Sequence, residues 1–198
     1  MMRAKTVTVT LILGLCSLAT APLAGADEAK PAAKPAAKAA PSDAEIIKSA
    51  LRAAPASVGK NATIVDMGAD GKMRTLRKGK NGFTCMPGKP NTQGLDSMCM
   101  DANAMEWAGA WMAHKPPPAG KVGMMYMLAG DSGASNTDPF ATGPTPTNHF
   151  IKTGSHVMVV GADAGLLDMY PKLADPDVTA PYVMWVGTPY QHLMMPVK

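Results

Sequence analysis

The stretch VGMMYML, residues 122–128, decides the fold class because it offers apolar side chains to both faces of a strand. Successive side chains of a strand point to opposite faces, so a strand of this kind is covered on both sides. Three further stretches share the pattern: HVMVVGA (156–162), YVMWVG (182–187) and HLMMPV (192–197). We expect these four stretches to belong to one antiparallel or mixed sheet with both faces covered.

Helical patterns lie before and among these strands. Ser42 and Glu45 form a capping box that opens a helix through about Ala54. The stretch DANAMEWAGAWMAH (101–114) winds into an amphipathic helix that buries its tryptophans and ends at three prolines. A small helix around AGLLDMY separates the second strand from the third. Because no regular βαβ repeat is present, the sequence predicts an α+β fold: a single compact domain with an antiparallel or mixed sheet and two to three short helices.

The first part of the chain indicates export. A short basic start precedes an uncharged apolar run, and AGA at 24–26 places small residues where a signal peptidase cleaves. We expect a signal peptide over residues 1–26, a flexible Ala/Pro/Lys-rich linker over 27–43, and one domain over 44–198. The protein is therefore expected to be periplasmic or secreted, with no transmembrane segment once the signal peptide is removed.

The charge is nearly balanced. The formal net charge is +4, and it falls to +2 when Arg3 and Lys5 leave with the signal peptide. A local excess of basic residues lies in a predicted hairpin formed by ATIVDM (62–67) and MRTLRKG (73–79). No aromatic platform or nucleic-acid motif accompanies this excess, so we expect a solvated hairpin face and no nucleic-acid partner.

Two cysteines, Cys85 and Cys99, follow the expected signal peptide. In an exported protein such a pair is most simply one disulfide, worth roughly 3 kcal/mol for a loop of this size. The alternative is a soft-metal site, because Met86, Met98 and Met100 neighbour the two thiols. The absence of a C-x-x-C motif favours the disulfide.

The tetrapeptide GDSG (130–133) is the sequence found around the nucleophile of chymotrypsin-like proteases, which would make Ser132 catalytic. Those enzymes need two barrels, with histidine and aspartate before the serine, and this domain is too short for them. The G-x-S-x-G elbow of lipases is also absent. We therefore expect a domain that is not an enzyme. The alternative is a small secreted hydrolase in which Ser132 or Asp131 acts with His149 or His156.

Methionine is unusually frequent, with 17 methionines against 3 phenylalanines. Most of this excess is expected to fill the core, because larger apolar residues are scarce. One arrangement points further. HVM and HLM each place a histidine and a methionine two residues apart, on one face of a predicted strand. If the two strands are neighbours, His156, Met158, His192 and Met194 form a two-His, two-Met site, which suits copper in either oxidation state.

The stretches NGFTCMPG, DSMCMD, MEWAGAWM, YMLAGDSGASNTDPFAT and PYVMWVGTPYQHLMMPV resemble a group of small secreted proteobacterial proteins that has no assigned function. The resemblance runs from about Ala54 onward and implies a single exported domain, with no activity and no ligand residues to carry over. We therefore expect an exported, non-enzymatic binding or envelope-associated domain with an unknown ligand or envelope-protein partner. Copper binding through histidine and methionine is the testable form of this hypothesis.

Overall fold

A computed structural model describes residues 40–68, 70–89 and 96–197. The expected signal peptide and the expected linker up to residue 39 lie outside the described residues. Within the described parts of the chain, no helix is both long enough and apolar enough to cross a membrane.

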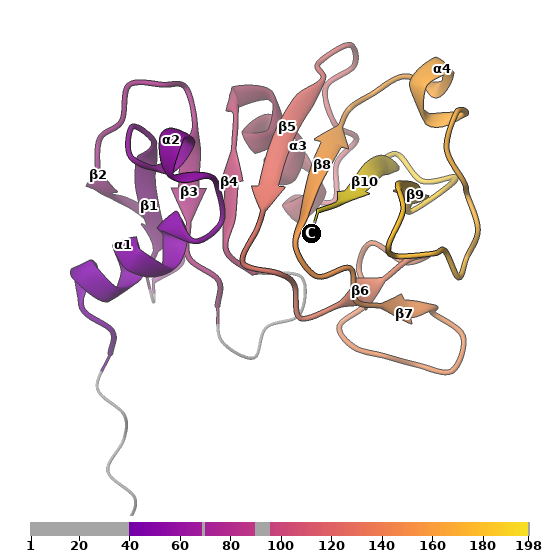
Figure 1. Cartoon of the computed structure of the whole chain (residues 1–198), viewed down its shortest axis with the longest axis horizontal. Helices are drawn as coiled ribbons and strands as arrows, with labels where there is room; N and C mark the ends of the chain where they lie inside the picture. The colour runs from indigo at the N-terminus through magenta and orange to yellow at the C-terminus, as the bar shows by residue number, and fades with distance from the viewer. Residues whose placement is uncertain (1–39, 69, 90–95, 198) are drawn as a thin grey trace, which may run out of the picture. The chain divides into compact units, whose positions relative to one another are not determined.

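The described residues form a single sheet-rich domain built on one eight-stranded sheet (Figure 1). The strand order is β2-β1-β3-β4-β5-β8-β10-β9. β1 and β3 are parallel, and all other neighbours are antiparallel, so the expected mixed sheet is confirmed. β6 and β7 pair with each other and form a separate two-stranded sheet. The bounds are β1 Thr63–Met67, β2 Met73–Arg77, β3 Thr84–Met86, β4 Met98–Met100, β5 Gly123–Met127, β6 Ala134–Ser135, β7 Phe150–Ile151, β8 His156–Val160, β9 Tyr182–Met184 and β10 His192–Pro196.

The four apolar stretches hold β5, β8, β9 and β10, which are consecutive neighbours in the sheet. β9 is shorter than the pattern predicts, because Trp185 turns the backbone out of the strand with a φ of 58°. The predicted hairpin is also present as the antiparallel pair β1 and β2. On its basic face, Arg74 contacts Asp66 and Asp43 at 3.0 and 2.8 Å.

Four helices occur in the described chain rather than two or three: α1 Asp43–Leu51, α2 Ala56–Gly59, α3 Ala102–Met112 and α4 Ala164–Leu167. The capping box of Ser42 and Glu45 begins α1 as expected. The single helix expected through Ala54 ends early at Leu51, and the one-turn α2 follows Pro55. Because strands outnumber helices and two helices are single turns, the domain is richer in sheet than a typical α+β fold.

The helices cover opposite faces of the sheet. α1 packs with Cys85, Cys99 and Ile64 on one face, and α3 packs on the other, where Figure 1 shows it behind the strands. Cys85 lies directly opposite Cys99 across β3 and β4, with the two sulfur atoms 2.02 Å apart, at disulfide distance. Because neighbouring residues of a strand alternate between faces, the flanking methionines point away from these sulfur atoms. A joint cysteine and methionine metal site is therefore not formed.

The buried methionines gather on one face of the sheet, which we call the methionine face. The core cluster beneath α3 contains seven buried methionines: Met98, Met100, Met125, Met127, Met158, Met184 and Met194. The clusters on the opposite face hold cysteine, isoleucine, leucine and valine, and their one methionine is the partly buried Met195. A residue used only as general core filler would be found on both faces, so this segregation calls for a further explanation.

Candidate functional site

The methionine face holds a cavity of about 100 Å³ beneath α3, which we call the inner cavity. Six of its lining residues are methionines, and His156 and His192 line it as well. All four ligands predicted from the sequence therefore border one cavity. The six methionines are Met98, Met125, Met127, Met158, Met184 and Met194.

The strand register arranges these side chains in rows. β8 and β10 are antiparallel neighbours, and Met158 lies directly opposite Met194. The same row continues through Met125 and Met100, which gives four methionines side by side on four adjacent strands. Facing side chains of such pairs have Cβ atoms about 5 Å apart, so the thioethers are in contact distance of one another.

The two histidines lie on either side of this row and not in it. His156 is paired with Pro196 and Met127, whereas His192 is paired with Met184 on β9. The register therefore separates the histidines by four residues along the strands, about 13 Å at the usual rise per residue. Met158 and Met194 lie between the two histidines along the strands. Each histidine therefore has a methionine of this row as its neighbour, although the histidine backbones are far apart.

His192 is held as a neutral imidazole with a free nitrogen. The side chain is 0% exposed, its Nδ1–H donates to the carbonyl of Tyr190 at 2.8 Å, and its Nε2 is buried without a partner. Burial lowers the pKa of His192 to about 4, and the charge of His156 adds to this effect while the hydrogen bond to Tyr190 opposes it. The lone pair of Nε2 is therefore available at neutral pH.

His156 has the same tautomer, set by a different carbonyl. Its Nδ1–H donates to the carbonyl of Gly154 at 2.7 Å, which leaves Nε2 for a ligand. Asp131 stands behind the ring, with Oδ2 3.6 Å from Nδ1. Burial raises the pKa of Asp131, and the nearby His156 partly offsets this. Oδ2 also accepts a hydrogen bond from the amide of Thr153, while the buried Oδ1 has no partner.

Three tryptophans surround His192, and they are all the tryptophans of the chain. The ring centroids of Trp107 and Trp185 lie 5.3 and 4.9 Å from that of His192, each nearly perpendicular to it. Trp111 lies 5.4 Å from Trp185. The inner cavity is therefore bounded by aromatic rings on the side of His192, whereas the sequence predicts helix packing for Trp107 and Trp111 and a strand position for Trp185.

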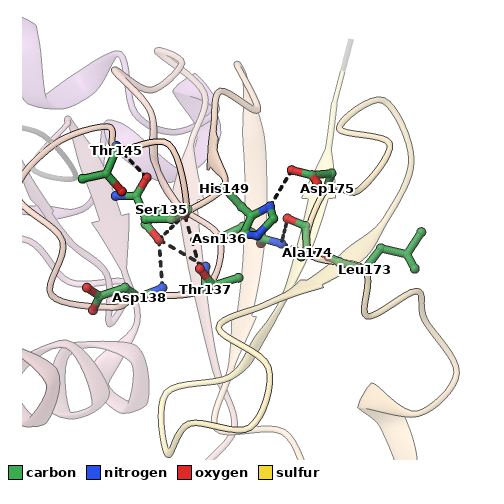
Figure 2. Close-up of polar contacts among 10 residues, drawn as sticks. Ser135, Asn136, Thr137, Asp138, Thr145, His149, Leu173, Ala174 and Asp175 are labelled. Atoms are coloured by element: carbon green, nitrogen blue, oxygen red, sulfur yellow. Dashed lines mark hydrogen bonds and ion pairs between the residues drawn. The ribbon is translucent and has the colours of Figure 1, made fainter.

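The GDSG stretch leads into the loop that anchors two of these rings. The indole N–H of Trp185 donates to the carbonyl of Ser135 at 2.8 Å, and that of Trp111 donates to the carbonyl of Pro139 at 3.0 Å. Figure 2 shows the polar contacts that fix this loop, with the Ser135 hydroxyl accepting from the amides of Thr137 and Asp138. The side-chain amide of Asn136 donates to the carbonyls of residues 173 and 174. The loop is thus a wall of the cavity.

The residues of the hydrolase alternative do not form a serine–histidine pair in the described structure, although Asp131 and His156 lie 3.6 Å apart. The hydroxyl of Ser132 donates to Asp96 at 2.9 Å, and its hydrogen bonds in the described structure involve no histidine. His149 pairs with Asp175 at 2.9 Å, as Figure 2 shows, and does not line the inner cavity. Asp131 borders the cavity beside His156, and Asp96, the partner of the Ser132 hydroxyl, lines the same cavity. A serine activated by a histidine is therefore not formed among these residues.

The charges and donor types of the lining favour a soft cation. Asp96, Asp131 and Asp138 line the inner cavity, and no lysine or arginine does. Within the parts of the chain that the structure describes, no group of three or more His, Cys, Asp or Glu side chains is placed to hold a metal ion. The thioethers and the neutral imidazole of the lining suit a soft cation.

The fold and the cavity define a sheet-rich domain with a methionine-lined internal site. Comparison of the chain with protein-family models, with curated proteins and with solved structures found no match.

Proposed function

We propose that this is an exported, non-enzymatic binding domain that holds Cu(I) in the inner cavity. The ligands are the Nε2 of His192 and the thioethers of Met158 and Met194, with His156 approaching from the other side of the methionine row. The observation that carries the proposal is the buried, unpartnered Nε2 of His192, which faces a cavity lined by six methionines. Leaving such an acceptor unsatisfied costs about 1–3 kcal/mol, which a ligand would recover.

The hydrogen bonds behind the histidines support a metal. A histidine that binds a metal through one ring nitrogen usually donates the N–H of the other to a carbonyl or carboxylate, which fixes its tautomer. His156 and His192 each donate Nδ1–H to a backbone carbonyl two residues earlier in the chain. Two equivalent arrangements on adjacent strands, both with Nε2 toward one cavity, are what a pair of copper ligands requires.

The size and walls of the cavity support a small cation over an organic ligand. Pockets for organic molecules are usually about 300–1,000 Å³, whereas the inner cavity is about 100 Å³. The rings of Trp107 and Trp185 give the cavity apolar walls beside His192. The aspartates that line the cavity would also attract a cation, and no lysine or arginine lines it to repel one.

An exported location fits this function. The disulfide of Cys85 and Cys99 and the absence of a membrane-spanning helix in the described chain are compatible with a periplasmic or extracellular protein. Cu(I) would be held there away from solvent, with neither thiol available for oxidation because both are joined in the disulfide.

The test is Cu(I) binding by the exported protein under anaerobic conditions, in competition with a chromophoric chelator. We expect one tightly held equivalent. His192→Ala should weaken it by about 100-fold, the upper range for loss of groups that support a metal ligand. His149→Ala is the matched control, since His149 lies outside the cavity, and it should leave the affinity unchanged. Wild-type protein that retains no copper against the chelator overturns the proposal.

A further inference from the structure

A second cavity on the same face of the sheet is lined by seven methionines. This outer cavity has a volume of about 160 Å³, lies between α3 and strands β1 to β4, and is bordered by no histidine or cysteine. Its methionines are Met67, Met73, Met86, Met98, Met100, Met105 and Met112. No residue of this set except Met98 lines the inner cavity.

The register pairs these methionines across the strands. Met67 lies directly opposite Met73 in β1 and β2, and Met86 lies directly opposite Met98 in β3 and β4. Cβ atoms of such pairs are about 5 Å apart, so each pair brings two thioethers to one place. From above, α3 adds Met105 and Met112, which are two helical turns apart and so lie on the same side of the helix.

The outer cavity is open to solvent at one end and buried at the other. Met73 and Met112 are 50% and 58% exposed, whereas Met100 is 1% exposed. Met73 and Met112 therefore bury less apolar surface than the core methionines do. The buried end meets the inner cavity, since Met98 and Trp111 border both.

We propose that the outer cavity is a second Cu(I) site, bound by thioethers alone and weaker than the inner site. The inference rests on the proposed function in that it concerns the same ion. Thioether sulfur selects Cu(I) over the harder divalent ions. Asp66 and Asp96 line the cavity together with Lys89, and Asp66 is already paired with Arg74. The site is weaker because it lacks an imidazole ligand.

The experiment is a titration of exported protein carrying ¹³C-methyl methionine with Ag(I), a redox-stable ion of the same charge and softness. Individual Met→Leu variants assign the methyl signals. We expect the first equivalent to shift the signals of Met158 and Met194. A second equivalent should shift those of Met67, Met73 and Met112.

Paired variants test the second site. Met67→Leu with Met73→Leu should weaken the second equivalent by about tenfold or more, the scale seen when a metal site loses supporting groups, and leave the first unchanged. Met169→Leu is the control, because Met169 is 74% exposed and borders neither cavity.

The outcomes are separable. If the first equivalent shifts Met158 and Met194 and no later equivalent shifts Met67 or Met73, the second site is refuted and the inner site stands. If no equivalent shifts Met158 or Met194, the proposed function fails, whatever happens at the outer cavity. If the Met112 methyl shifts equally in the Met67→Leu, Met73→Leu protein, the thioethers of Met67 and Met73 do not bind the ion and the second site is also refuted.

Discussion

Met158 in β8 lies directly opposite Met194 in β10, on the face of the sheet that borders the inner cavity. His192 lies two residues before Met194 in the same strand, and its side chain is on the same face of the sheet. A pair of thioethers and a neutral imidazole therefore share one wall of the cavity. Each of these residues alone would pass as core. Their placement beside an unpartnered nitrogen is what distinguishes a site from packing.

Replacing the two methionines should separate binding from stability. Met158→Leu with Met194→Leu conserves side-chain volume and shape approximately, so each substitution should cost less than about 1.5 kcal/mol of unfolding free energy. Cu(I) affinity should nevertheless fall sharply, because leucine supplies no ligand. Urea unfolding and chelator competition on the same preparation measure both quantities.

The control for this pair is Met195→Leu, on the same strand but in the cluster of the opposite face. It should leave Cu(I) affinity unchanged. If the Met158, Met194 variant binds copper as tightly as wild type, the thioethers are core filling and are not ligands.

The low pKa of His192 predicts a loss of stability in mild acid. Its folded-state pKa is about 4, below the ordinary value of 6.5, so the unfolded chain takes up the proton first as the pH falls. The contribution of the neutral ring is complete above about pH 6.5 and is lost as the pH falls toward 4. Between about pH 7 and pH 5 this amounts to about 2 kcal/mol of unfolding free energy.

His192→Asn is the informative comparison, because the amide can still donate toward the carbonyl of Tyr190 and does not titrate in this range. Metal-free wild type should lose about 2 kcal/mol more than this variant over that interval. Denaturant unfolding at the two pH values measures the difference. Parallel losses in the two proteins would show that His192 is not the group that titrates.

The charge of Asp131 should lower the stability of the fold and strengthen cation binding. Burial raises the pKa of its carboxyl, so the ionised form that is present at neutral pH is disfavoured in the fold, and this cost grows as the pH rises through the folded pKa. Asp131→Asn keeps an acceptor for the amide of Thr153 and removes the charge. We expect higher resistance to urea near pH 7 and weaker Cu(I) binding. A variant that is less stable and equally tight in binding would contradict both parts.

Much of the fold follows from local patterns in the sequence. The capping box of Ser42 and the strands β5, β8 and β10 depend on residues close together in the chain, and the structure has them where they were expected. The disulfide was predictable because only two cysteines follow the expected signal peptide. The predicted ligand pairs of β8 and β10 depend only on the alternation of side chains along a strand.

Other features depend on contacts between distant segments. The row from Met100 to Met194 requires the order and register of four strands, which no single stretch specifies. β6 and β7 have two residues each, too few to show a period. The positive φ of Trp185 and its bond to Ser135 arise from a loop 50 residues earlier, so the aromatic wall could not be anticipated from the helix pattern around Trp107.

The disulfide should matter for stability and not for copper. Cys85 and Cys99 lie on the face away from the inner cavity and are both fully buried. Replacing both by alanine removes a cross-link with a sequence separation of 14 residues, which should lower the unfolding free energy by about 3 kcal/mol. Cu(I) affinity of the folded variant should match wild type. Weaker binding would instead assign the thiols to the copper site.

Tryptophan fluorescence should report copper directly. Trp107 and Trp185 have ring centroids within 5.3 Å of that of His192, and the ring centroid of Trp111 lies 5.4 Å from that of Trp185, so every indole of the chain is near the proposed ligand. One equivalent of Cu(I) should therefore quench most of the emission, with a titration end point equal to that of the chelator assay. In His192→Ala, whose indoles are unchanged, the same addition should quench little. Quenching that persists in this variant, or that requires many equivalents, would mean that the ion reaches the indoles from solution and is not held at His192.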